Sequence, residues 1–182
     1  TLHVEPMTPS AKVPLITHLW SSGHNSDYMM GHTTAHNGNP DFYDTTFVLN
    51  YMAANPDHTL VKLECGGYTS VVLVDVGGGE LRVFGFGENN AYQLGTNNNS
   101  RVDNTMKESI LYTQYAQAND TRVKTLRASW YASGVLFENG VIMSTGNGGK
   151  FMADSDVGNA HNTLREATFV QDYCAANACE VV

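Results

Sequence analysis

Basic residues are scarce in this sequence, and charge is low altogether. Its 182 residues include 10 Lys and Arg against 18 Asp and Glu, so the formal net charge is −8, and only 15% of residues are charged. Nucleic acids and anionic membrane surfaces are bound through a basic face that neutralises phosphates. The composition therefore argues against both kinds of partner.

Cysteines are also few, and long apolar runs are missing. Three cysteines do not make a disulfide framework. Cys174 and Cys179 are spaced to clip a local turn, but we expect a pair of buried thiols. The best apolar run, at 71–74, has the length of a strand and not of a membrane span. The 42% of hydrophobic residues nevertheless suffices for a packed core.

Signatures of catalysis and of cofactor binding are lacking. There is no G-x-S-x-G motif, and the glycines at 77–79 lack the Lys-Ser/Thr of a phosphate loop. The stretch DSDVG at 154–158 lacks the terminal Glu and the flanking helices of a calcium loop. We therefore expect no enzyme, no catalytic residue and no cofactor.

Histidines cluster near the N-terminus without the spacing of a metal site. His24, His32 and His36 lie within 13 residues, near His18, in sequence rich in Asn, Gly and Thr. A zinc site needs three or four converging ligands. We predict solvated loop histidines, with a zinc site as the alternative.

The sequence does contain an internal repeat of about 60 residues. The block GHNSDYMMG at 23–31 recurs as GENNAYQLG at 87–95, at an offset of 64. A weaker third copy, GNGGKF, occupies 146–151. A second block, YMAAN at 51–55, recurs at the same offset as YAQAN and, 58 residues further on, as YCAAN. Two blocks that keep one spacing are a specific signal.

We interpret the recurring residues of the first block as scaffold, because a packing residue has reason to recur in every copy and a binding residue has none. The glycines are placed at strand ends, where a Cβ would obstruct a tight turn. Asn side chains can bond the turn backbone, and the aromatic residues are expected to pack beneath it. The set comprises Gly23, Asn25, Tyr28, Gly31, Gly87, Asn89, Tyr92, Gly95, Gly146 and Phe151.

The secondary-structure pattern favours blades of a propeller. Apolar segments flank Asn139-Gly140, a strong hairpin signal, and the glycine cluster at 77–79 is flanked in the same manner. Further short strands are predicted at 60–63 and 123–126, and one short helix fits within 106–118. Many short strands with Gly-rich turns and a fixed period are typical of propellers.

We divide the chain into an N-terminal extension, 1–14, and one partial propeller domain, 15–182, with repeats at about 15–65, 66–128 and 129–182. Three blades cannot close a ring, so sheet edges would stay open. The chain opens on Thr1 and stops within a predicted strand. We expect a fragment of a longer chain, a protein completed by another chain, or an oligomer that shares blades.

The segment FGENNAYQLG at 86–95 resembles the hallmark W-G-x-N-x-x-G-Q-L-G of the regulator of chromosome condensation (RCC1-like) repeat. The resemblance covers about 15–182 and is best in the middle copy. It implies an all-β fold, a partial β-propeller of about three four-stranded blades.

The best-known activity of that family is guanine-nucleotide exchange on the small GTPase Ran. The resemblance implies that Asp and His in the step G-x-D-H-S would face the GTPase. Here the two steps read GGYTS and SWYAS. Tyr68 and Tyr131 take the place of Asp, Thr69 and Ala132 take that of His, and the final serine matches in both copies. These copies therefore lack the acidic and imidazole groups.

What the same loops offer is aromatic. Tyr and Trp are favoured interface anchors, because they bury a large rigid area and keep a polar tip. A long polar loop at 96–107 adds a cation. The candidate partner-binding residues are Tyr68, Thr69, Trp130, Tyr131 and Arg101. Packing of the rings between blades, and plain exposure of the loop, are the alternatives.

The leading interpretation is a non-catalytic protein–protein interaction or scaffold module, part of a larger RCC1-like propeller or multi-chain assembly. Its expected partner is a protein, or further blades that complete the propeller. The first alternative is an exchange factor for a small GTPase. The second is a secreted enzyme inhibitor, since bacterial β-lactamase inhibitors share this fold and the sequons at Asn98 and Asn119 permit secretion.

Overall fold

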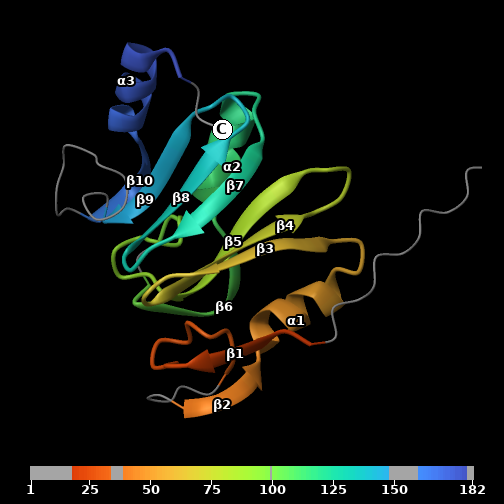
Figure 1. The fold of residues 1–182 in the computed structure, drawn as a ribbon. Coiled ribbons are helices and arrows are strands. Elements are labelled where there is room, and N and C mark those ends of the chain that lie inside the picture. The colour runs from red at the N-terminus through yellow and green to blue at the C-terminus, as the bar shows by residue number, and fades with distance from the viewer. Residues whose placement is uncertain (1–17, 34–38, 99, 148–159, 180–182) are drawn as a thin grey trace, which may run out of the picture.

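The computed structural model describes residues 18–33, 39–98, 100–147 and 160–179. They form antiparallel sheets and three short helices (Figure 1). We call the first sheet the half blade: β1 (Trp20–Gly23) and β2 (Asn39–Asp44). The first blade contains β3 (Thr59–Cys65), β4 (Thr69–Asp75), β5 (Leu81–Glu88) and β6 (Val102–Glu108). The second blade contains β7 (Val123–Ala128), β8 (Ala132–Phe137), β9 (Ile142–Asn147) and β10 (Ala160–Glu166).

The predicted strands at 60–63 and 123–126 are confirmed, as are the apolar segments that flank the glycines at 77–79 and the hairpin at Asn139-Gly140. Both four-stranded sheets are antiparallel meanders in chain order. Their turns use residues that tolerate positive φ, such as Gly140 at +83° and Gly78 at +66°. The predicted partial propeller is therefore present. In the described part of the chain, however, its first sheet has two strands rather than four.

A helix follows each sheet: α1 (Thr46–Ala54), α2 (Ile110–Ala118) and α3 (Thr168–Asn177). The sequence predicted only the middle helix, and the first residues of its range, 106–108, belong to β6. The YxxAN blocks belong to the helices. In each block the Asn amide donates to the Tyr carbonyl four residues back, for example Asn55 to Tyr51 at 2.8 Å and Asn119 to Tyr115 at 2.9 Å. The recurring Asn thus caps each helix end. None of the helices is long and apolar enough to cross a membrane, among the residues described.

The hydrophobic core lies between neighbouring sheets. On one face of β4, Val71 and Leu73 pack with β8 and with Tyr112 of α2. On the other face, Val72 and Val74 pack with Phe47 and Met52 of α1 and with β5. Because β4 is buried on both faces, its sequence TSVVLVD is continuously apolar in its middle instead of alternating.

The half blade has the register of the last two strands of a full blade. Trp20 pairs with Asp44, as Phe84 of β5 pairs with Glu108 of β6. These residues are related by the offset of 64. β1 and β2 therefore correspond to β5 and β6, and the side of β1 that β4 would occupy in a full blade carries no described strand.

The hallmark glycines allow us to separate backbone strain from crowding. Gly87 and Gly146 have φ of +101° and +99°, and a Cβ would lie 2.6 and 2.3 Å from the carbonyl oxygens of Tyr68 and Tyr131. Gly23 has a similar φ of +120°, but a Cβ added there would have nothing within 4 Å.

We predict that Gly23→Ala lowers the unfolding free energy by about 1–2 kcal/mol, from backbone strain alone. Gly87→Ala and Gly146→Ala should each cost about 1–3 kcal/mol more. Urea unfolding measures the difference, and equal losses at all three positions would contradict it.

The burial of Tyr112 predicts that the protein loses stability at alkaline pH. Its hydroxyl is fully buried and donates to the carbonyl of Ser133 at 2.8 Å. Burial raises the pKa of Tyr112 well above its ordinary value, although the hydrogen bond to Ser133 opposes the shift. The pKa of Tyr112 is higher in the folded than in the unfolded protein. Its contribution to the unfolding free energy is therefore complete below about pH 10 and is lost as the pH rises further.

We therefore expect the unfolding free energy to fall by about 1.4 kcal/mol per pH unit from this group above pH ~10. Tyr112→Phe should be less stable at pH 7 by about 1–2 kcal/mol, because the Ser133 carbonyl loses its donor. The gap to the wild type should narrow at alkaline pH. Urea unfolding of both proteins at several pH values tests this, and a constant gap would show that Tyr112 does not titrate as described.

Candidate functional site

Two loops that enter equivalent hairpins lie side by side at one end of the blades. The loop after β3 closes with a hydrogen bond from Gly66 N–H to the Thr69 carbonyl at 2.7 Å. The loop after β7 closes in the same way, from Ser129 N–H to the Ala132 carbonyl at 2.9 Å. A Cβ on Gly66 would lie 2.0 Å from the carbonyl oxygen of Ser129. The two backbones thus approach at a distance that requires glycine.

The aromatic rings of these loops form one cluster. The centroid of Tyr68 lies 5.6 Å from that of Trp130, edge to face, and 5.6 Å from that of Tyr131. The Trp130 and Tyr131 centroids are 6.4 Å apart. We call Tyr68, Trp130 and Tyr131 the aromatic surface. Offset and edge-to-face pairs of this kind are favourable beyond the area they bury.

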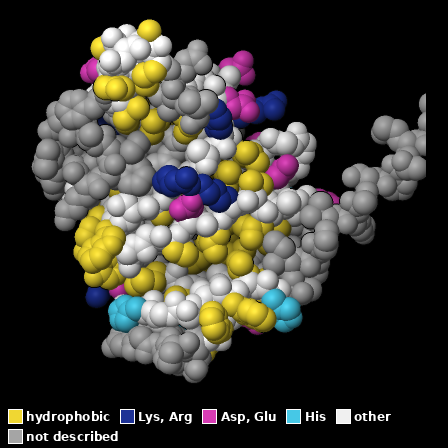
Figure 2. All heavy atoms as spheres, viewed as in Figure 1, with side chains coloured by type: hydrophobic (Ala, Val, Ile, Leu, Met, Phe, Trp, Pro, Cys, Tyr) yellow, Lys and Arg dark blue, Asp and Glu magenta, His cyan; other side chains and the backbone are white. Residues whose placement is uncertain are grey.

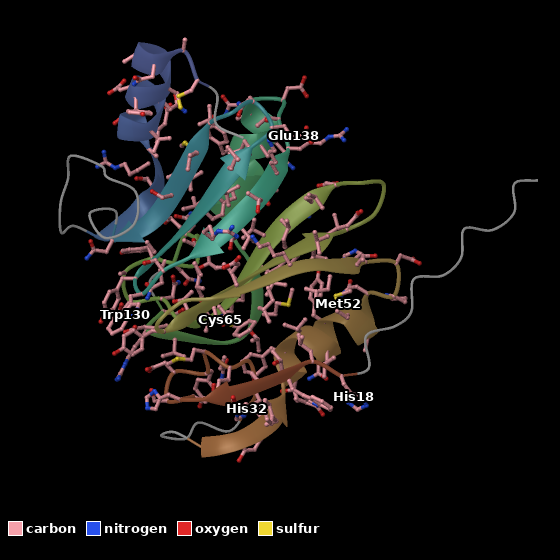
Figure 3. All side chains as sticks on the ribbon, viewed as in Figure 1. His18, His32, Met52, Cys65, Trp130 and Glu138 are labelled. Carbon is pink, nitrogen blue, oxygen red and sulfur yellow. The ribbon has the colours of Figure 1, made fainter. Side chains whose placement is uncertain are left out.

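Trp130 is the most exposed ring of the aromatic surface. Its side chain is 60% exposed, and its ring covers Gly67, where a Cβ would lie 2.6 Å from the ring. Figure 3 places it at the edge of the blades, and Figure 2 shows hydrophobic side chains gathered there. A ring that is held in place on one side and open on the other can bury area against a partner at little entropic cost.

The carboxylate of Glu88 lies near the rings, and the guanidinium of Arg101 lies near that carboxylate. Burial raises the pKa of Glu88, the nearby Asp27 adds to the shift, and Arg101 opposes it. The pKa of Tyr131 is raised in turn, first by desolvation and then by Tyr68 and Glu88. Glu88 therefore lies within electrostatic reach of both Arg101 and the rings. The aromatic surface has a polar rim of mixed charge, the usual anatomy of a protein interface.

Thr69 is placed differently from the other candidates. It is fully buried, and its hydroxyl donates to the carbonyl of Glu88 at 2.9 Å. It ties β4 to β5 and is not part of the aromatic surface. The serine of each step is also structural. Ser70 donates to the carbonyl of Met29 at 2.6 Å, and Ser133 donates to that of Gln93 at 2.7 Å. Each serine thus joins a blade to the hallmark turn of the blade before it.

The hallmark turns are organised by their buried Asn side chains. Asn89 accepts a hydrogen bond from Leu94 N–H at 2.9 Å and donates to the carbonyl of Asn98 at 2.8 Å. Asn25 accepts from Met30 N–H at 2.8 Å. Tyr92, at the place of a hallmark glycine, has φ of +60°. Phe151 lies outside the described residues.

The histidines and cysteines differ from expectation. His32 is buried, 3.4 Å from the Asn25 amide nitrogen and stacked on Tyr43, so the prediction of a solvated loop residue is wrong for it. His36 lies outside the described residues. Within the part of the chain that the structure describes, no three potential metal ligands gather.

Cys179 is exposed and Cys174 only partly buried, so the prediction of buried thiols is wrong.

A groove of about 730 Å³ lies at the other end of the strands, between α2 and the two hairpin turns. Its lining mixes both signs of charge, with Glu80, Arg82, Asp120, Arg122 and Glu138. We assign no chemistry to it.

Sequence reasoning missed Glu88 at the aromatic surface. The available signal was the position of Glu88 directly after the hallmark Gly87. Glu88 ends β5 next to the loop after β3.

Comparison with known proteins finds likeness in structure only. No family model matches the sequence, and no curated protein matches it. The crystal structure of human WBSCR16 superposes with a TM-score of 0.59 at 20% identity, over 86% of this chain and 36% of that one.

Two yeast structures superpose in the same way. Prp20p from Saccharomyces cerevisiae, characterised together with its binding to Gsp1p and histones, gives a TM-score of 0.55 at 18% identity, over 81% of this chain and 33% of that one. Yeast RCC1 (Prp20) in the structure with Kap60 gives 0.56 at 15%, over 91% and 40%. The chain thus has an RCC1-like propeller fold and spans less than half the length of these proteins.

Replacement of Trp130 should leave the fold intact. Because the side chain is 60% exposed, we expect Trp130→Ala to lower the unfolding free energy by about 1 kcal/mol. Phe86→Ala is the control, since Phe86 is 1% exposed and its loss should cost about 3–5 kcal/mol. Urea unfolding measures both, and equal costs would mean that Trp130 is a packing residue.

Proposed function

We propose that the chain is a non-catalytic protein–protein interaction module of an RCC1-like propeller, and that the aromatic surface binds its protein partner. The observation that supports this most directly is the exposure of Trp130 at the junction of two blades. A large ring exposed at 60% loses water when a partner covers it.

Electrostatics favour a protein partner over nucleic acid. The net charge is −8, and beside the aromatic surface Glu88 lies within electrostatic reach of Arg101, so both signs of charge are present there. A rim of both signs suits the mixed side chains of a protein surface. The superposed yeast proteins support the proposal as well, because Prp20p is described with Gsp1p and histones, and Prp20 with Kap60.

Exchange on a small GTPase is the second candidate, and its support is the resemblance in fold. At the two places of the acidic residue the loops carry Tyr68 and Tyr131. The residues at the places of the imidazole, Thr69 and Ala132, are buried. An exchange factor in the family pattern would need acidic and imidazole groups there. We therefore propose binding without catalysis, with further blades completing the propeller.

A photo-crosslinking experiment tests the proposal. A photoreactive phenylalanine analogue replaces Trp130 in one protein and Glu138, at the opposite end of the strands, in a matched control. In extract of the source cells, only the Trp130 probe should capture a defined protein. Unlabelled wild-type chain should compete for it, and a Trp130→Ala, Tyr131→Ala chain should compete at least tenfold less well.

Equal competition by wild type and double variant would contradict the proposal. A nucleotide-release assay with a panel of small GTPases separates the two candidates. Accelerated nucleotide release that depends on the aromatic surface would show that the chain acts as an exchange factor and not as a binding module without catalysis.

A further inference from the structure

Equivalent residues of the two four-stranded blades contact one another along β3 and β7. The ammonium group of Lys62 donates to the hydroxyl of Thr125 at 3.2 Å and to the carbonyl of Leu126 at 3.1 Å. Two residues further on, the carboxylate of Glu64 accepts from Nη1 of Arg127 at 2.6 Å. The contacts Lys62–Thr125 and Glu64–Arg127 both span 63 positions. They therefore join a position of the repeat to the same position in the next blade.

The aromatic surface continues this series of contacts. Gly67 lies under the ring of Trp130, where a Cβ would be 2.6 Å away. The ring centroids of Tyr68 and Tyr131 are 5.6 Å apart. Both pairs again span 63 positions. Because Arg127 lies three residues before Trp130, the ion pair and the rings belong to one continuous line of contacts between the blades.

The attachment of β3 to the second blade is polar. Its apolar side chains Leu60 and Leu63 pack on the core cluster that includes α1. The apolar contact of the first blade with the second is made by β4 instead. Among the residues described, Lys62 and Glu64 supply the side-chain hydrogen bonds from β3 to β7. The position of the loop after β3 relative to β7 therefore depends on charged groups.

We call Lys62, Glu64 and Arg127 the ion network, and Glu64 is its centre. The Lys62 nitrogen lies 2.9 Å from the same carboxylate oxygen that accepts from Arg127. Burial would raise the pKa of Glu64, but the hydrogen bonds and charges of Lys62 and Arg127 outweigh it and hold that pKa below its ordinary value. The side chain of Arg127 is 63% exposed, and ion pairs with an exposed partner add little to stability. The effect of the network should therefore be on the position of its neighbours.

We propose that the ion network positions the aromatic surface, by holding the loops after β3 and β7 in register so that Trp130 stays seated on Gly67. Glu64, Lys62 and Arg127 are positioning residues that act through the ring. A ring that is fixed before binding spares the cost of ordering it in the complex. The inference rests on the proposed function for its consequence in binding, but its effect on Trp130 is measurable without a partner.

The motion of the Trp130 ring tests the inference. In a Trp20→Phe chain, Trp130 is the single tryptophan, and its time-resolved fluorescence anisotropy reports the nanosecond motion of the ring. We expect Glu64→Gln and Arg127→Gln each to raise the amplitude of that motion at least twofold. The double variant should show no more motion than either single variant, because each change removes the same contact between the blades.

Arg82→Gln is the matched control. It removes another Arg–Glu ion pair, 2.8 Å from Arg82 to Glu80, at the opposite end of the strands, and should leave the motion of Trp130 unchanged. Arg127→Lys retains the cation and should restore most of the order of the ring.

Salt and urea separate positioning from stability. Sodium chloride at about 1 M, where the Debye length is about 3 Å, should loosen the ring in the Trp20→Phe chain and have no further effect on Glu64→Gln. The urea midpoint of Glu64→Gln should stay close to that of the Trp20→Phe chain, because the network adds little to stability.

Unchanged ring motion in Glu64→Gln would overturn the inference, as would an equal change in the Arg82→Gln control. Increased motion that comes with a large drop in the urea midpoint would also overturn it, since the network would then be a structural contact. In the crosslinking assay, the Glu64→Gln chain should compete about threefold to tenfold less well than the wild type, and equal competition would overturn the inference. If the ring loosens as expected but the Trp130 probe captures no defined protein, the proposed function fails and the effect of the network on the ring stands.

Discussion

The packing of each short helix on the sheet that follows it is the interaction on which the rest of this structure depends. α1 and α2 are nine residues long, and neither has a side-chain cap at its N-terminus. Helices of this length are marginal in water, so their stability comes from tertiary packing. That packing supplies one wall of each cluster of the core. In an array built in this way, each repeat is stabilised by contacts with its immediate neighbours. A repeat at either end has fewer such contacts than a repeat in the interior.

The same constraint positions the aromatic surface. Once α2 and the apolar side chains of β4 and β8 fix the second blade beside the first, the loops after β3 and β7 meet at the same end. Glycine at positions 66 and 67 allows the backbones and the Trp130 ring to approach. The aromatic surface is therefore a consequence of blade stacking, and it requires two blades and not one. A scaffold of rigid sheets that carries its recognition groups on loops is a common arrangement.

The strands and the hallmark turns could be predicted from the sequence, because their signals are local. Asn139-Gly140 specifies a tight turn, and the recurring Gly and Asn residues specify another. α1 and α3 were not predicted, because neither has a strong helical pattern. The stability of α1 lies in its tertiary contacts. The burial of Thr69 and His32 was missed for a related reason. A small polar side chain in a loop carries no sign of whether its hydrogen-bond partner is the solvent or a neighbouring strand.

Hydrogen exchange at the backbone amides of the three helices tests the central claim most directly. The 182-residue chain at low micromolar concentration is the suitable protein. The account predicts that the amides of α1 and α2 exchange only on global unfolding, because a following blade covers each helix. The amides of α3 should exchange through local opening at a far smaller free energy. Equal protection of all three helices would contradict the dependence of each helix on the blade that follows it.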